Sequence, residues 1–218
     1  MGIKERKLRE RDKRRKDILG ITKELFETHG LSSTTIEDIA KMAELSPATI
    51  YTHFRNKDEL YASLNLITLE ILYREMGKVY LNEKLDPVEK LFELKNVIYN
   101  GFKFDPLIIK NIIRFQLDDT LITLSPELLT QINKITKNAM NMISNTYESG
   151  VRQGIFRKEN SMAIADIFWA ICTGVMVYEE AKKKISPQKD FFKSTLEIAI
   201  ATFIEGLKIK KDAIHLKV

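Results

Sequence analysis

The sequence has few of the residues that would place it outside the cell or in a membrane. It contains a single cysteine, Cys172, among 218 residues, so no disulfide can form within one chain, which fits a reducing compartment. The longest uncharged run in its second half, residues 167–178, is about twelve residues, whereas a bilayer-spanning helix needs about twenty. The basic start is followed by no apolar run of the kind found in secretory signals. We therefore expect a cytoplasmic protein with no membrane partner.

Residues for catalysis or metal binding are equally sparse. The three histidines, His29, His53 and His215, are far apart in the sequence and show no metal-ligand spacing. Cys172 lies among apolar residues, which favours a buried thiol over a nucleophile. The chain has no glycine-rich phosphate loop and no glycine-flanked nucleophilic serine. We therefore predict no enzyme activity, no cofactor and no metal site.

Proline and glycine are scarce, with five and nine residues, which leaves little room for disordered linkers. Apolar residues recur every three or four positions and no strand pattern occurs, so we predict an all-α chain of about nine helices. Ser-Pro pairs at 46–47, 125–126 and 186–187 are typical of helix starts, because proline needs no N–H donor there. After a first helix that Gly30 ends, the expected helices span residues 36–43, 47–54, 57–80, 87–103, 106–117, 126–150, 160–183 and 187–208.

The net charge of +5 is unevenly distributed. Residues 1–16 carry nine Lys or Arg against three acids, for 9 − 3 = +6, whereas residues 17–60 carry four against eight, for 4 − 8 = −4. Two interpretations of the basic segment stay open. Acid–base pairs four residues apart favour a solvated extension of the first helix. Alternatively, one of its arginines binds a phosphate or the minor groove: Arg11, Arg14 or Arg15.

The most informative segment, residues 34–61, contains three helix starts. Thr35 and Asp38 have the spacing of a capping box, Ser46 precedes a proline, and Asn56 stands three residues before a glutamate. Two short helices joined by a turn of about three residues indicate a helix-turn-helix. The second of these helices carries groups that can bond to phosphates or base edges: Ser46, Thr49, Tyr51, Thr52 and His53.

This segment resembles the DNA-binding part of the TetR family of transcriptional regulators. The similarity covers about residues 14–61, and its strongest part is the pattern T-x-Y-x-x-F-x-x-K-x-x-L over residues 49–60. Two positions depart from the pattern of many members: Glu44 in the turn and Ala48 in the recognition helix stand where those members have glycine. We expect Glu44 to adopt the turn conformation at some energetic cost.

The resemblance implies that the helix-turn-helix binds an operator in double-stranded DNA. Tyr51, His53 and Lys57 would then contact phosphates, and Thr35 would hold a phosphate at a helix N-terminus. The recognition helix has no Arg, Asn or Gln for bidentate readout, so DNA shape would contribute to specificity. The predicted DNA-binding residues are Arg14, Thr35, Ser46, Pro47, Ala48, Thr49, Tyr51, Thr52, His53 and Lys57.

Residues 1–60 are thus expected to form the DNA-binding domain, and residues 61–218 a helical domain for effector binding and dimerisation. By resemblance, a small apolar or amphipathic effector would release a repressor from a palindromic operator. The aromatic and methionine residues assigned to the effector pocket could instead be ordinary core residues. The alternative function is a DNA-bound structural or protein-interaction factor without an effector. The residues proposed to line the effector pocket are Tyr73, Met76, Phe102, Phe115, Met140, Tyr147 and Trp169.

The helices expected at 160–183 and 187–208 are apolar on more than one side, so each is buried against more than one neighbour. One interpretation is an ordinary core pair within the chain. The other, which the resemblance favours, is a homodimer in which these helices form a four-helix bundle with a second copy. The predicted interface residues are Ile167, Ile171, Val175, Leu196, Phe203 and Leu207.

Overall fold

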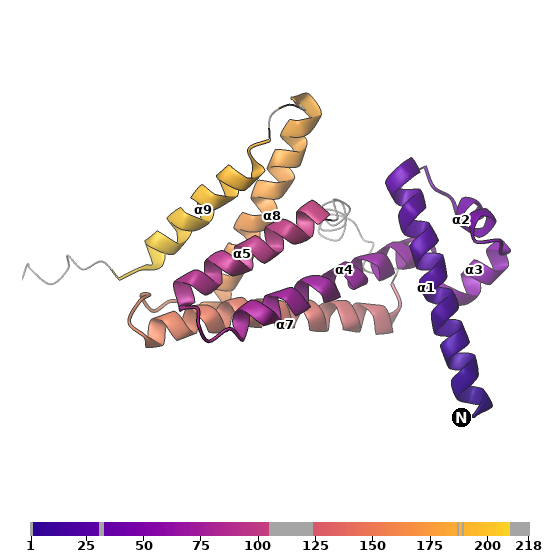
Figure 1. Ribbon diagram of the computed structural model, residues 1–218, viewed down its shortest axis with the longest axis horizontal. Helices are drawn as coiled ribbons and strands as arrows, with labels where there is room; N and C mark the ends of the chain where they lie inside the picture. The colour runs from indigo at the N-terminus through magenta and orange to yellow at the C-terminus, as the bar shows by residue number, and fades with distance from the viewer. Residues whose placement is uncertain (1, 31–32, 105–123, 187, 189, 210–218) are drawn as a thin grey trace, which may run out of the picture. The chain divides into compact units, whose positions relative to one another are not determined.

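The computed structural model describes all residues except 1, 31–32, 105–123, 187, 189 and 210–218, and the described part is all-α, as predicted (Figure 1). Its β-structure there is limited to one isolated antiparallel bridge between Phe156 and Lys208. The helix expected at 106–117 lies outside the described residues. The helices are α1 (Ile3–His29), α2 (Ile36–Met42), α3 (Pro47–His53), α4 (Lys57–Tyr80), α5 (Pro87–Phe104), α7 (Pro126–Arg152), α8 (Ser161–Ile185) and α9 (Phe192–Leu207).

The predicted caps of α2 and α3 are confirmed. Asp38 N donates to Thr35 Oγ1 at 3.1 Å, and Thr35 N donates to the Asp38 carboxylate at 2.8 Å, which closes the capping box. Thr49 N donates to Ser46 Oγ at 3.1 Å, with Pro47 at the first helical position. These bonds satisfy amides that have no partner within a first helical turn. Both helices therefore begin where local sequence chemistry dictates.

The start predicted for the last helix is wrong. The Ser186-Pro187 pair was expected to open a helix at residue 187, but α8 continues to Ile185 and Ser186 ends it by donating its N–H to the carbonyl of Lys182 at 2.9 Å. The last helix, α9, begins only at Phe192. A Ser-Pro pair marks a break in a helix as well as a start, because the residue before proline disfavours helical backbone.

The chain divides into two compact units. The first comprises Met1–Ile67 and Arg114–Gln131, and of the latter range only residues 124–131 are described. The chain passes from the first unit to the second after Ile67, within α4, whereas the sequence predicted a boundary after residue 60. Within this unit α2 packs on α1 and on α3 (Figure 1). The buried core that they enclose consists of Ile18, Leu19, Leu25, Ile36, Ile39, Ala40, Ile50, Phe54 and Leu60.

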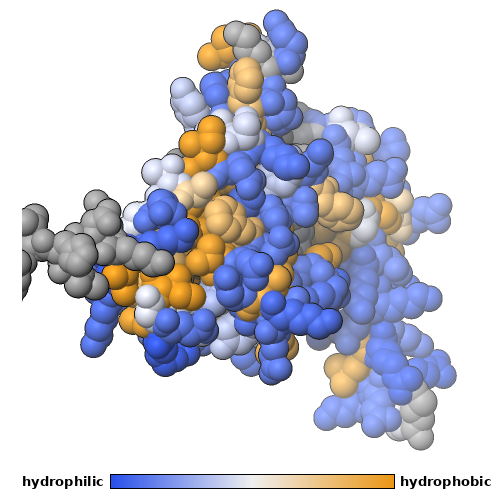
Figure 2. All heavy atoms as spheres, turned by 60° about the vertical axis from the view of Figure 1, so that its left-hand side comes forward, coloured by the Kyte–Doolittle hydropathy of each residue, from blue (hydrophilic) through white to orange (hydrophobic). Residues whose placement is uncertain are grey.

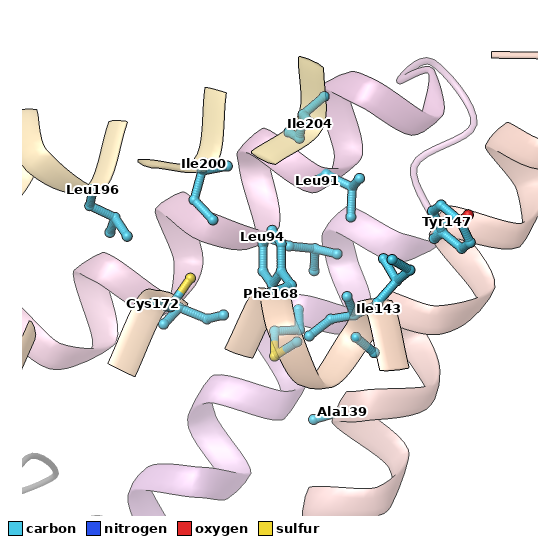
Figure 3. Packing of buried hydrophobic residues seen from close by; sticks show 14 of the residues in the cluster. Leu91, Leu94, Ala139, Ile143, Tyr147, Phe168, Cys172, Leu196, Ile200 and Ile204 are labelled. Carbon is cyan, nitrogen blue, oxygen red and sulfur yellow. The ribbon is translucent and has the colours of Figure 1, made fainter. Parts of the chain in front are cut away.

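The described part of the second unit comprises residues 68–104, 132–186, 188 and 190–209. Its core brings together Leu94 of α5, Ile143 of α7, Phe168 of α8 and Ile200 of α9 (Figure 3). By length and composition α8 would pass for a membrane-spanning helix, but core helices pass the same test. Phe168 and the other core-facing side chains of α8 are buried against its neighbours, and 33% of its most apolar stretch is buried in all.

A close approach between α7 and the segment after it closes one end of this core. Gly150 lies inside α7, two residues before its end, and an added Cβ there would overlap the ring of Phe156. That ring stacks on Tyr147, with centroids 5.6 Å apart, and the Tyr147 hydroxyl donates to the carbonyl of Arg157 at 2.5 Å. Gly154, with φ of 69°, forms the turn between the end of α7 and Phe156. Glycine is therefore needed at 150 for space and at 154 for backbone conformation.

An ion pair joins α5 to α9. Lys95 is buried, and its Nζ donates to Glu197 Oε2 at 2.5 Å. Only 4% of the Lys95 side chain is exposed, against 51% for that of Glu197. The lysine charge therefore depends on this one carboxylate, whereas the carboxylate also reaches water.

Candidate nucleic-acid interface

The helix α3 faces outward over most of its surface. Among its seven residues, only Ile50 is buried. Five of the predicted DNA-binding residues around it are exposed, with Tyr51 52% exposed. The helix is thus anchored by one apolar side chain and its caps, which leaves its outer side chains exposed, although the Ser46 and Thr52 hydroxyls already make hydrogen bonds within the helix. The exposed five are Ser46, Pro47, Ala48, Tyr51 and Thr52, while Thr49, His53 and Lys57 are partly buried.

The turn before α3 contains a strained residue. Glu44 has φ of 53°, and no other non-glycine residue of the described chain has a positive φ. This confirms the expected turn conformation, which costs a residue with a Cβ about 1 kcal/mol or more. The turn lets Leu45 N donate to the carbonyl of Ala40 at 2.9 Å and so fixes the angle between α2 and α3.

Thr35, predicted to bind a phosphate, is exposed at the start of α2 but already engaged. Its hydroxyl donates to the Asp38 carboxylate at 2.7 Å. The hydrogen bonds from Thr35 hold the pKa of Asp38 below its usual range. A phosphate at this helix N-terminus would be repelled by the negative charge of the Asp38 carboxylate. Asp38 would have to move before the phosphate could bind to Thr35.

The structure brings Arg14 and His53 together, although they are 39 residues apart. Both line a groove of about 660 Å³ between α1 and the helix-turn-helix, with Glu10 and Asp17 as its acids. His53 Nδ1 is buried and has no hydrogen-bond partner among the described residues. Burial, followed by the charges of Arg11, Arg15 and Arg14, lowers the pKa of His53. The groove therefore gathers Arg11, Lys13 and Arg14 around His53, and the neighbouring arginine charges favour the neutral imidazole.

The basic N-terminal segment is helical from Ile3, so it continues α1, as the first of the two interpretations holds. Its side chains are exposed, apart from the partly buried Arg15. A helix with its side chains is about 10–12 Å across, and the minor groove of B-DNA is about 6 Å wide. As a helix, the segment is too wide to enter the minor groove as a whole, so the contact of one of its arginines with a phosphate or with the minor groove stays a prediction.

Arg15 is turned inward, unlike the arginines before it. It donates from Nη1 to the carbonyl of His53 at 2.5 Å and from Nη2 to Ser63 Oγ at 2.8 Å. Its guanidinium lies 4.0 Å from the ring centroid of Phe54. Sequence reasoning counted Arg15 among the phosphate candidates, because nothing local signals partners 38 and 48 residues away.

The predicted effector residues belong to the packed interior of the second unit. Met76, Phe102 and Tyr147 are buried in its core. Tyr73, Met140 and Trp169 are partly buried and pack against that core. Phe115 lies outside the described residues. The assignment of these residues to a pocket stays a prediction.

The predicted dimer residues divide into two sets. Leu196 and Leu207 are 1% and 3% exposed, because α9 packs this face onto α5 and α8 of its own chain. Ile167 is 46% exposed, and the remaining three, Ile171, Val175 and Phe203, are partly buried. The predicted set does not include three further exposed apolar side chains of these helices, Tyr178 at 62%, Ile185 at 86% and Ile198 at 67%. Figure 2 shows apolar side chains reaching the surface among charged ones.

Two observations concern the residues considered above for metal binding and catalysis. No three His, Cys, Asp or Glu side chains there could hold a metal ion together. Burial raises the pKa of the Cys172 thiol to about 12, so the thiolate that a nucleophile requires does not form near neutral pH.

Comparisons with known proteins place the helix-turn-helix in a family. The family model "Bacterial regulatory proteins, tetR family" matches residues 18–64. The chain is 40% identical over 53 residues to the HTH-type transcriptional regulator QacR of Staphylococcus aureus, covering 24% of this chain and 27% of QacR. It is 35% identical over 66 residues to the HTH-type transcriptional regulator AcrR of Shigella flexneri, covering 28% and 31%. The matched segments span less than a third of either relative.

The fold similarity extends over nearly the whole chain. The transcriptional regulator FadR of Bacillus subtilis, solved in complex with stearoyl-CoA, superposes with a TM-score of 0.65 at 20% identity. The match covers 88% of this chain and 98% of that one. Such identity shows the fold alone, while the segment around α2 and α3 carries the sequence signature. Residues 18–64 therefore carry the helix-turn-helix segment of the TetR family of bacterial regulatory proteins, on a chain whose fold is that of such regulators.

Proposed function

We propose that this protein is a cytoplasmic transcriptional repressor that binds a near-palindromic operator as a homodimer. The observation that supports this most is the outward presentation of α3, which buries only Ile50 and exposes Ser46 to Ala48, Tyr51 and Thr52. One such helix per protomer would enter successive major grooves whose centres are about 34–36 Å apart. The groove that holds Arg14 and His53 would receive a phosphate beside each half-site.

The exposed apolar positions of α8 and α9 support the dimer. Ile167 and Tyr178 on α8 and Ile198 on α9 are large and exposed. Small residues on the exposed faces, such as Ala170 and Gly174, allow close helix approach. Two copies of this helix pair would form a four-helix bundle with two-fold symmetry.

An apolar or amphipathic effector would bind in the second unit. Its interior is rich in aromatic and methionine side chains, among them Met76, Phe102 and Trp169, which suit such ligands. The FadR structure with its stearoyl-CoA supports a long-chain acyl compound as the first class to test. A ligand that favours the non-binding state by a few kcal/mol would release most of the protein from DNA.

The test of DNA binding uses Tyr51→Ala and Lys57→Ala. Binding to DNA fragments recovered by genomic footprinting is measured by fluorescence anisotropy at several salt concentrations. Both variants should weaken binding to all sequences, and Lys57→Ala should reduce the slope of log affinity against log salt by about 1. Lys84→Ala, an exposed lysine of the second unit, is the control and should bind as wild type. Unchanged affinity in both test variants would contradict this interface.

The alternative is a DNA-bound structural or protein-interaction factor without an effector. The burial of Met76, Phe102 and Tyr147 in a packed core favours it. Thermal unfolding in the presence of acyl-CoA compounds of graded chain length separates the two. A melting temperature that rises with ligand concentration supports the effector, whereas no rise with any chain length supports the alternative.

A further inference from the structure

Arg15 differs from the basic residues around it in α1, because it is partly buried whereas Arg11, Lys13 and Arg14 are exposed. We propose that Arg15 is a positioning residue that fixes the orientation of the recognition helix α3, and that it makes no contact with DNA. This role deepens the proposed function and rests on it, since orientation of α3 matters only if α3 reads DNA.

The geometry of Arg15 links three helices. Its two Nη atoms donate to the carbonyl of His53, the last residue of α3, at 2.5 Å and to Ser63 Oγ of α4 at 2.8 Å. Its guanidinium stacks 4.0 Å from the ring centroid of Phe54, the C-cap of α3. Only arginine has a planar fork that donates in two directions while it stacks on a ring.

The helix α3 needs such a contact at its end. Helices this short are marginal on their own, and α3 has seven residues with Ile50 as its one buried side chain. The Ser46 cap holds its N-terminal end, whereas the last carbonyls of a helix lack partners within it and favour a cation. Arg15 supplies both the donor and the charge. Without it, the C-terminal end of α3 would be held in place only by the packing of Ile50 and Phe54.

The charge of a buried carboxylate, Glu59, favours the charged form of Arg15. Glu59 is 6% exposed and accepts hydrogen bonds from Arg55 N at 2.7 Å and from Ser125 Oγ at 3.1 Å. Burial lowers the pKa of Arg15, and the charge of Glu59 is the largest contribution that opposes this. Ser125 directly precedes α7, and Glu59 lies in the first turn of α4. The network thus connects the end of α3 to the starts of both helices that continue into the second unit.

The experiment compares Arg15→Lys and Arg15→Met with Arg14→Met, its exposed neighbour. Affinity is measured for the footprinted fragment and for random-sequence DNA over a range of salt, and amide hydrogen exchange is measured over residues 47–54 of the free protein. For both Arg15 variants, the ratio of specific to random-sequence affinity should fall about tenfold or more, with an unchanged salt slope. Exchange over residues 47–54 should accelerate about tenfold or more. Arg14→Met should instead weaken both kinds of DNA alike and reduce the slope by about 1.

Two results would overturn the proposal. One is a reduced salt slope with equal losses on both DNAs for Arg15→Lys, which identifies a phosphate contact. The other is wild-type exchange over residues 47–54 together with a wild-type affinity ratio. If Arg15→Met does not fold, Ser63→Ala removes one acceptor of the fork and should show a smaller change in the same direction. Failure of the wild-type protein to bind any DNA would reject the proposed function, while the exchange measurement would still decide whether Arg15 holds α3.

Discussion

Gly150 is a residue whose side chain must be absent for the core of the second unit to close. The ring of Phe156 occupies the space that a Cβ would need, on the inner side of α7. We expect Gly150→Ala to lower the free energy of unfolding by about 1–3 kcal/mol, because the ring must shift out of a close-packed site. Urea unfolding followed by circular dichroism measures this.

Gly20→Ala is the control for this prediction. Gly20 also lies within a helix, α1, but open space surrounds it. Alanine there should raise the free energy of unfolding by up to about 1 kcal/mol through helix propensity alone. A stabilising effect at both positions would show that the Phe156 ring yields without cost.

His53 should make DNA affinity depend on pH. Burial and the neighbouring arginines hold its pKa below the ordinary value of about 6.5 in the free protein, and a phosphate in the groove would raise that pKa. Binding would then be accompanied by proton uptake, so affinity should rise as pH falls from about 7.5 through 6.5 and level off below the free-protein pKa. Anisotropy titrations at constant ionic strength test this. In His53→Gln the dependence should flatten, and a dependence that persists unchanged would assign the proton to another group.

At the scale of helices, the Lys95–Glu197 pair is the polar link between α5 and α9. Removing the carboxylate leaves a buried ammonium without its partner, whereas removing the lysine leaves a half-exposed carboxylate that water can solvate. We therefore expect Glu197→Gln to destabilise the fold by more than about 1 kcal/mol and Lys95→Met to have little effect or to stabilise it. Thermal unfolding of both variants and of the double variant measures the asymmetry. Equal losses in the two single variants would refute it.

The helices themselves were largely predictable from sequence, because their ends are set by local chemistry. Thr35, Ser46 and Asn56 cap the helices that follow them, and proline fixes the first turn of α3, α5 and α7. The same local reasoning failed at Ser186, because a Ser-Pro pair can follow the end of one helix or precede the start of the next. The exposed residues of α3 were also predictable. Ile50 is the large aliphatic residue of this short helix, so the side that carries it faces the core and the other residues face outward.

What sequence could not show are contacts between distant positions. Arg15 looks like its neighbours in a basic run, and its inward turn depends on a carbonyl and a hydroxyl supplied by other helices. Lys95 lies among apolar residues of α5, and its charge would predict a surface position. It is buried because Glu197 of α9 lies beside it and accepts its hydrogen bond. Likewise, Leu196 and Ile198 are equally apolar, and only packing decides which of the two is buried.

At the scale of the whole molecule, the central prediction is the dimer. Ile198→Glu places a charge on the exposed face of α9 without touching the core, since Ile198 is 67% exposed. It should convert the dimer to monomer at micromolar concentration, because an unpaired charge in an apolar interface is costly. Light scattering coupled to size exclusion measures the mass. Leu81→Glu, at an equally exposed leucine after α4, is the control and should leave the mass unchanged. A dimer that survives Ile198→Glu would exclude this face.

The inert thiol of Cys172 has a practical consequence for observing the assembly at work. Since burial keeps that sulfur protonated and inaccessible, a second cysteine placed at an exposed position such as Lys41 would be the one site that a maleimide dye modifies. Cys172 itself would not have to be replaced. A dimer carrying one donor and one acceptor fluorophore would then report, molecule by molecule, how far apart the two recognition helices stand before and after a candidate effector is added.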